Sequence, residues 1–371
     1  MLRAALVVVI ALAGAACKRD EPAPPATAPG GPTAPALDPA LVVAVDARIE
    51  LVSIVARLAG FPEYGEPART AYLRAADAHF APWRDHPAVA RARGLRAEHG
   101  ISFNAPVSLA LYLDDAFAPR RPLRPPLPGL DPRWSPVDLD AVAAELADFA
   151  RQSDLAGFLA DQRPFLTAVE ARVGEALAGH RFVAWLEATF GPRPATFRVI
   201  PGLTTGNQAY GAFAVDADGQ EQVAQVLYLP PPAADGVPRP GADAALLLVH
   251  ELLHSYVNPA LDADRARLEP VAAPLFARVE AAMARQHYRD VMIMVNESVV
   301  RALVVLYARD RGAADVADRQ LVVELRSSFL WTRELVAALD GARQARGGRL
   351  PPDVLAATTR DTFAAWAAAN P

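Results

Sequence analysis

Residues 244–257 form the most constraining feature of the chain, an apolar run, AALLLVHELLHSYV, that contains the pattern H-E-x-x-H. Ala and Leu favour helix, and no Pro or Gly interrupts the run before Pro259. On a helix, residues four apart share a face, so His250 and His254 are predicted to point the same way, one turn apart. Two imidazoles so placed can bind one Zn²⁺, and Glu251 lies close enough to reach a water on the metal.

The alternative interpretation of the same pattern is a buried helix with two incidental histidines. That interpretation is costly, because burying two imidazoles and a carboxylate among apolar residues requires partners for each of them. We therefore predict a zinc helix, with His250 and His254 as ligands and Glu251 as a general base.

Strand patterns precede this helix. Residues 195–200 and 208–215 alternate between apolar and polar or small side chains, and residues 222–229 form a third strand pattern. The D-A-D-G turn at residues 216–219 joins the second and third strands as an antiparallel hairpin. The fold class predicted is therefore α+β and mostly α-helical, with a small antiparallel sheet directly before the HExxH helix.

The order of a sheet followed by an HExxH helix resembles the zincin metallopeptidases. In that superfamily an edge strand upstream of the helix binds extended peptide by adding a strand. The resemblance implies that residues 207–211, with Asn207, Ala209 and Tyr210, bind substrate in this way. An ordinary hairpin strand is the alternative for these residues.

A catalytic zinc site needs a third protein ligand. The metzincin pattern requires Gly at 257 and His at 260, but the chain has Val257 and Ala260. The gluzincin pattern requires a Glu on a later helix, and the Asn296-Glu297 pair in an apolar run of residues 291–307 resembles it. Glu297 is therefore the predicted third ligand.

Arg301 stands where thermolysin-like gluzincins have an Asp four residues after the ligand Glu, so the partners of the ligands differ from that pattern. The alternative interpretation of both residues is an i,i+4 ion pair between Glu297 and Arg301 on a helix face. Other residues remain candidates for the third ligand: Glu280, His287, Asp262 and Asp264.

The function expected of such a site is zinc-dependent hydrolysis of peptide bonds. The metal would activate a water, Glu251 would accept its proton, and a His or Tyr donor would stabilise the oxyanion. Candidates for that donor are His287, Tyr288 and Tyr210. Two other classes remain open: a zincin-fold binding protein with little or no turnover, which Arg301 favours, and a zinc hydrolase of a non-peptide substrate.

The N-terminus has the pattern of an export signal. Arg3 precedes a short apolar segment that ends at Gly14-Ala15-Ala16-Cys17, so residues 1–16 are predicted to be a signal peptide. This ending resembles a bacterial lipoprotein signal, which implies a lipid anchor on Cys17, the single cysteine of the chain. Residues 17–39 continue as a Pro- and Ala-rich linker. The protein is thus expected to be exported to the cell envelope and held at a membrane.

The remaining chain divides into a helical part, residues 40–190, and a catalytic part, residues 191–371, or forms one continuous domain of residues 40–371. Helical spacing predicts helices over residues 42–58, 68–80, 88–98, 139–152, 164–177, 181–190, 321–339 and 353–368. Residues 118–138 are too rich in Pro for regular structure and are predicted to be a long loop or lid. The net charge of −5 and the absence of a long basic run argue against nucleic acid as a partner.

The chain also resembles a family of bacterial domains of unknown function that often occur in lipoproteins. The resemblance rests on residues 48–54, RIELVSI, on residues 250–259, HELLHSYVNP, and on residues 296–302, NESVVRA. It implies a gluzincin-like peptidase with no known substrate.

Overall fold

The computed structural model describes residues 36–66, 69–193, 195–232, 234–286 and 288–370. The predicted signal peptide and Cys17 lie outside the described residues, as does His287. The described chain is α+β and mostly helical, and it contains one small sheet.

The sheet has four strands in the order β1-β2-β4-β3. Their bounds are β1 Leu41–Val43, β2 Ala195–Gly202, β3 Tyr210–Val215 and β4 Glu221–Tyr228. The predicted hairpin is confirmed, because β3 pairs antiparallel with β4. The prediction of a purely antiparallel sheet is wrong, because β2 pairs in parallel with both β1 and β4.

The chain path explains this mixed sheet. After β2 the chain skips one position and enters β3 at the sheet edge, and the tight turn at residues 216–219 returns β4 into the gap beside β2. The Asp216 carboxylate fixes this turn by accepting the backbone N–H groups of Asp218 and Gln220 at 3.0 and 2.8 Å. Alternation of side chains reveals strands but does not reveal which strands are neighbours.

The predicted helix over residues 42–58 is two elements. The β-branched pair Val42-Val43 belongs to strand β1, and helix α1, Ala47–Leu58, begins after Asp46. Asp46 is the N-cap, and its Oδ1 accepts the backbone N–H of Arg48 at 3.0 Å.

Seven further α-helices lie in the described part of the chain between α1 and β2. They are α2 Ala71–Phe80, α3 Pro87–His99, α4 Ala105–Ala110, α5 Leu139–Gln152, α6 Leu155–Asp161, α7 Arg163–Leu177 and α8 Phe182–Phe190. The five predicted ones agree within a few residues, and the short α4 and α6 were not predicted. His86 caps α3 by accepting the backbone N–H of Ala88.

Six α-helices follow the sheet among the residues that the structure describes. They are α9 Ala244–Ala263, α10 Arg265–Arg285, α11 Val291–Asp310, α12 Ala314–Arg326, α13 Thr332–Gln344 and α14 Pro352–Ala369. The prediction of one helix over residues 321–339 is wrong, since Ser328 has φ 71 and ends the run between α12 and α13. The break buries Phe329 and Trp331, which an unbroken helix would have spread around its surface.

Helix α9 continues past Pro259, a residue that usually interrupts a helix. Proline lacks an N–H, so the carbonyl of Ser255, four residues earlier, loses its helical partner. The guanidinium of Arg193 fills that position, with Nη1 2.6 Å from the Ser255 oxygen. Arg193 also lies over the ring of Tyr256 at 5.2 Å and pairs with Glu221 on β4. One arginine therefore joins the bend in α9 to the sheet.

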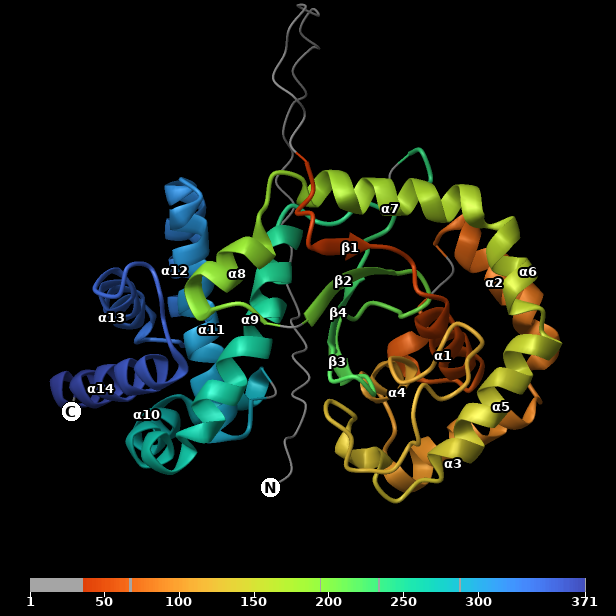
Figure 1. The fold of residues 1–371 in the computed structure, drawn as a ribbon, viewed down its shortest axis with the longest axis horizontal. Helices are drawn as coiled ribbons and strands as arrows, with labels where there is room; N and C mark the ends of the chain where they lie inside the picture. Colours follow the sequence, from red (N-terminus) through yellow and green to blue (C-terminus); the bar gives the residue numbers. More distant parts are fainter. Residues whose placement is uncertain (1–35, 67–68, 194, 233, 287, 371) are drawn as a thin grey trace, which may run out of the picture.

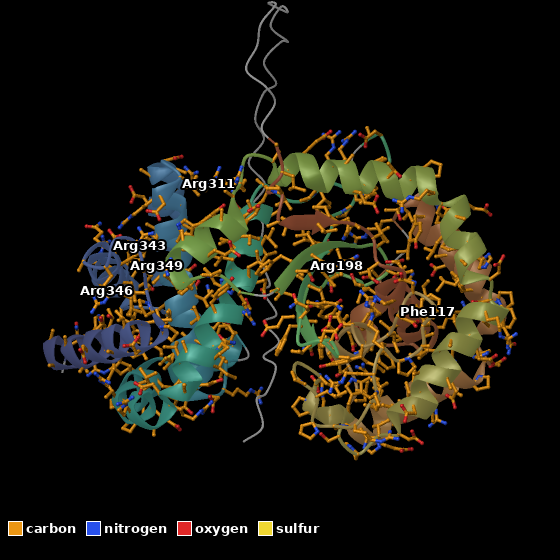
Figure 2. All side chains as sticks on the ribbon, in the orientation of Figure 1. Phe117, Arg198, Arg311, Arg343, Arg346 and Arg349 are labelled. Carbon is orange, nitrogen blue, oxygen red and sulfur yellow. The ribbon has the colours of Figure 1, made fainter. Side chains whose placement is uncertain are left out.

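The sheet lies between two groups of helices (Figure 1). Helices α1 to α6 lie on one side and α8 to α14 on the other, with α7 along the top in this view. Helix α9 packs on β4, whereas α4 packs beside β3. Side chains fill the space on both sides of the strands, and Arg198, labelled beside β2 in Figure 2, lies 3.7 Å from Asp46.

Helix α11 is the core of the second group. It contacts α9, α10, α12 and α13, and residues 294–308 are buried. The helix is long and apolar enough to cross a membrane, but 89% of its most apolar window is buried within the protein. Its composition is thus accounted for by its central position.

The Pro-rich connection, residues 118–138, packs closely against the rest of the chain. Leu123, Leu127, Leu130 and Trp134 are buried. This segment contributes to the core and is more than a surface loop.

The buried carboxyl of Glu50 on α1 provides a test of the packing. Its Oε2 accepts the Tyr72 hydroxyl at 2.6 Å, and its Oε1 has no hydrogen-bond partner among the described residues. Burial raises the pKa of Glu50 to about 7, partly offset by the Tyr72 hydrogen bond. The folded state therefore holds this proton more tightly than the unfolded chain does.

We expect Glu50 to favour folding below about pH 4.5 and this contribution to be lost as the pH rises through 7, by up to about 3 kcal/mol. Glu50→Gln, which mimics the protonated form, should therefore gain stability over the wild type at pH 8 compared with pH 5. Urea unfolding of both proteins at the two pH values measures this. An unchanged difference in the free energy of unfolding would contradict the assignment.

Candidate metal centre

The two histidines of helix α9 converge as predicted. Their Nε2 atoms lie 3.2 Å apart, and their ring centroids are separated by 4.9 Å. His250 is buried, and the Nδ1 atom of His254 lies 3.1 Å from Oδ1 of Asn258, one turn further along the helix. That contact leaves Nε2 of His254 facing His250. The role of Asn258 was not predicted, although its position four residues after His254 was the available signal.

Glu297 on α11 completes the cluster. Its Oε1 lies 3.3 Å from Nε2 of His254, and its Oε2 lies 3.6 Å from Nε2 of His250. One ligand atom from each of the three residues lies within 4.8 Å of the others. The packing of α11 on α9 brings together residues 43 or more positions apart in the chain.

The other candidates for the third ligand that the structure describes do not join this cluster. Glu280 is exposed on α10, Asp262 bonds to Arg265, and Asp264 bonds to Arg267. Among the described residues, only His250, His254 and Glu297 form a group of three or more metal-compatible side chains.

The three side chains fit a divalent metal. Two imidazole nitrogens and one carboxylate oxygen are a donor set that Zn²⁺ accepts, with a position left for water. Oε1 of Glu297 is buried and makes no hydrogen bond to any described residue, so the donor is available. An unmatched buried carboxylate oxygen is costly without a ligand.

The ionisation of the cluster follows from burial and proximity. Burial lowers the pKa of His250 to about 3, only partly offset by Glu297. Burial would also lower the pKa of His254, but the Glu297 carboxylate, whose Oε1 lies 3.3 Å from Nε2 of His254, raises it to about 9. Burial would raise the pKa of Glu297, but His254, His250 and Arg301 lower it to about 2. Without a metal, a proton on His254 balances the Glu297 charge.

Glu251 lies between the metal cluster and the sheet. A Cβ atom added to Gly211 on β3 would lie 3.3 Å from Oε2 of Glu251 and 3.3 Å from Oε1 of Gln225. Burial raises the pKa of Glu251 to about 7, partly offset by His254. The predicted base therefore adjoins the strand predicted to bind substrate, and Gly is the residue that permits this approach.

The predicted oxyanion donors have different positions. Tyr288 reaches the site, where its hydroxyl donates to Oε2 of Glu297 at 3.3 Å. Tyr210 points away, because adjacent strand residues face opposite sides and its ring stacks on Tyr64 at 5.8 Å. Of the predicted edge residues, Asn207 and Ala209 precede β3, and Asn207 is exposed.

Arg301 organises the far side of Glu297. Its Nε lies 3.2 Å from Oε2 of Glu297, and its Nη2 lies 3.1 Å from the Tyr288 hydroxyl. Its Nη1 bonds at 2.6 Å to Glu324, a buried residue of α12. Phe329 lies 4.4 Å below the guanidinium. The predicted Glu297–Arg301 pair and the predicted ligand are thus compatible, since they use the two oxygens of one carboxylate.

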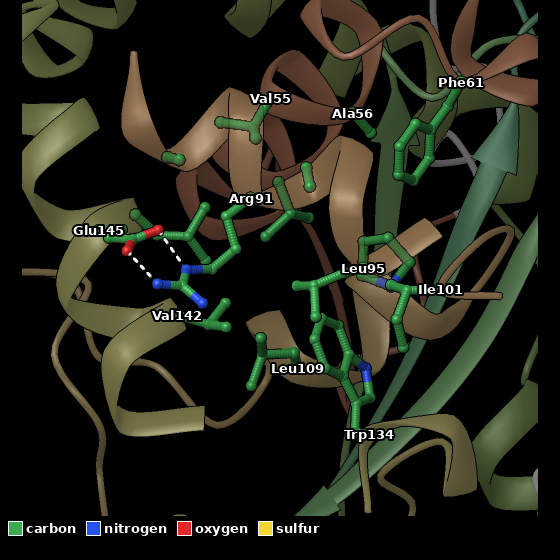
Figure 3. A pocket seen from close by; sticks show the side chains of 15 residues that line it. Val55, Ala56, Phe61, Arg91, Leu95, Ile101, Leu109, Trp134, Val142 and Glu145 are labelled. Carbon is green, nitrogen blue, oxygen red and sulfur yellow. Dashed lines mark hydrogen bonds and ion pairs between the residues drawn. The ribbon is translucent and has the colours of Figure 1, made fainter. Parts of the chain in front are cut away.

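A separate apolar pocket lies among α1, α3, α4 and α5 (Figure 3). Its empty volume, open solvent included, is about 450 Å³. Arg91 and Glu145 form a two-bond ion pair among its lining residues, at 2.5 and 2.6 Å. Neither α9 nor α11 lines this pocket, so it is distinct from the metal cluster.

Comparison with known families gives one match. The family described as "Domain of unknown function (DUF4932)" matches residues 132–349, which include β2 to β4, α9 and α11. The chain belongs to this family. No curated protein and no solved structure matches the chain. The three cluster residues and Glu251 all lie within the family region.

Loss of a cluster residue should abolish tight zinc binding. We expect His254→Ala and Glu297→Ala to weaken zinc binding by more than about 100-fold, beyond what loss of an outer partner causes. Zinc should raise the melting temperature of the wild type but not of these variants, because binding stabilises only the folded state. Metal analysis and thermal unfolding measure this. Glu280→Ala and Asp262→Ala are controls, and equal zinc loss in them would contradict the cluster.

Removing the buried guanidinium of Arg301 should destabilise the folded protein. Arg301→Met leaves the carboxylates of Glu297 and Glu324 without their counter-charge, and we expect a loss of about 3–5 kcal/mol in the free energy of unfolding. Arg319→Met removes an exposed pair with Asp315 and should cost less than about 1 kcal/mol. Urea unfolding compares them, and similar losses in both variants would show that Arg301 does not hold Glu297.

Proposed function

We propose that this protein is a zinc-dependent hydrolase of peptide bonds, a gluzincin-like metallopeptidase. The observation that carries the proposal is the convergence of His250, His254 and Glu297 from two helices, with Glu251 beside the cluster. The order of elements in the chain, with the β3–β4 hairpin before the HExxH helix, supports a zincin-like arrangement.

The ligand set assigned to the metal is His250, His254 and Glu297. A bound zinc ion would supply Lewis acidity, which lowers the pKa of water and polarises a carbonyl. The residues of the chain do the rest. Glu251 takes a proton from the attacking water and later gives it to the leaving amine. Arg301 and Tyr288 hold Oε2 of Glu297, so its Oε1 stays directed at the histidines.

The position of strand β3 beside Glu251 also supports the proposal. The backbone of β3 reaches Glu251 at Gly211, so a peptide laid along β3 would have its carbonyl near the base. This geometry favours a peptide over a small non-peptide substrate. The pairing of Arg301 with Glu324 also removes the reason to favour an inactive binding protein, because the arginine is neutralised without displacing a ligand.

We further propose that the protein is exported to the cell envelope and anchored to a membrane through a lipid on Cys17. The support is the sequence pattern that ends at this cysteine. Residues 17–39 would then hold the folded body away from the membrane.

Glu251→Gln should lower kcat/KM for an unstructured protein such as casein by about 100- to 10,000-fold, because the amide cannot accept a proton. Zinc content should stay at the wild-type value, since Glu251 is not a ligand. Glu280→Gln, an exposed carboxylate on α10, is the matched control and should retain activity. Wild-type protein that binds zinc yet never exceeds Glu251→Gln would exclude the peptidase function and leave the binding-protein alternative.

A further inference from the structure

Strand β3 is an edge strand, and the direction of its backbone groups can be derived. The N–H of Asp216 donates to the Gln220 carbonyl across the turn, which makes that pair hydrogen-bonded. In an antiparallel ladder hydrogen-bonded and non-hydrogen-bonded pairs alternate. The backbone groups of residues 211, 213 and 215 therefore point outward, away from β4.

The Pro-rich connection covers the second half of this edge. Gly129 lies so close to the Phe213 carbonyl that a Cβ on it would overlap that oxygen. The Val215 carbonyl accepts a hydrogen bond from Nη1 of Arg121, with 3.4 Å between the nitrogen and the oxygen. Tyr112 also holds the connection, because its hydroxyl donates a hydrogen bond to the carbonyl of Pro128. A peptide cannot add a strand beside residues 213–215 while the connection occupies that position.

The first half of the edge is open. Gly211 is exposed, and its outward N–H and C=O make no backbone hydrogen bond to another loop within the described residues. Gly211 is also the residue of β3 that approaches Glu251. Gly211, the open position of the edge, is therefore also the position beside the proposed catalytic base Glu251. The covered positions begin two residues later, at Phe213.

We propose that the site is an exopeptidase site that releases one or two residues from a free peptide N-terminus. This inference rests on the proposed peptidase function. A peptide on β3 is expected to run antiparallel to it, as β4 does, because that pairing is the more stable one. Its N-terminal end then points toward residue 215, where the edge is closed. Only the residue opposite Gly211 and one before it fit between the bond to be cleaved and Phe213.

The reaction itself is hydrolysis and needs no other reactant. The water oxygen bonds to the carbonyl carbon of the first or second residue, the C–N bond breaks, and the electron pair and a proton go to the new amine. The products are a free amino acid or dipeptide and a shortened peptide.

One ten-residue peptide, attached to beads at either end, tests the proposal. Attached at its C-terminus, it should release single residues or dipeptides in order from the free N-terminus, identified by mass spectrometry. Attached at its N-terminus, it should be cleaved at least about ten-fold more slowly. Glu251→Gln protein gives the background rate for both.

The outcomes separate the two proposals. Internal cuts, equal rates for the two attachments, or release from a free C-terminus would overturn the exopeptidase proposal and leave the peptidase function standing. No hydrolysis of either peptide, or of casein, above the Glu251→Gln background would overturn both.

Binding gives a readout that does not depend on turnover. The same two immobilised peptides, presented to zinc-free protein on a biosensor surface, should differ at least about ten-fold in Kd, with the free N-terminus bound more tightly. Equal binding of the two would contradict the closed edge.

Discussion

The structure depends on a carboxylate buried in the middle of the long, apolar helix α11. Glu297 is fully enclosed on α11, where an unpaired charge would be very costly. Two sets of partners make its burial possible: the imidazoles of α9 on one side, and Arg301 with Tyr288 on the other. Arg301 in turn needs Glu324 on α12. The packing of helices α9, α11 and α12 and the geometry of the cluster therefore depend on each other.

In the proposed function, the sheet relates this cluster to a substrate. Helix α9 packs on β4, and Glu251 of this helix meets the edge strand β3 at its one residue without a side chain, Gly211. The helices before the sheet contribute on the opposite side, where Tyr210 stacks on Tyr64, and through the Pro-rich connection that closes part of the edge. The first half of the chain, which carries no residue of the metal cluster, thus shapes what can reach it.

The sequence allowed prediction of the features that short-range periodicity controls. The i,i+4 spacing of His250 and His254 fixed their common face, and an isolated Glu in an apolar helix indicated a buried partner for Glu297. Features set by long-range packing were not predictable. Nothing near Glu324 indicates that α12 packs on α11, and the mixed pairing of β2 depends on which strands become neighbours. The extension of α9 past Pro259 required Arg193, which lies far away in the sequence.

Anomalous diffraction at the zinc absorption edge, from crystals grown with one equivalent of zinc, tests the central claim most directly. We expect one peak about 2 Å from Nε2 of His250, Nε2 of His254 and a carboxylate oxygen of Glu297, with Arg301 still bonded to the other oxygen. A zinc peak at another group of side chains, or at the two histidines with Glu297 turned away toward Arg301, would contradict it.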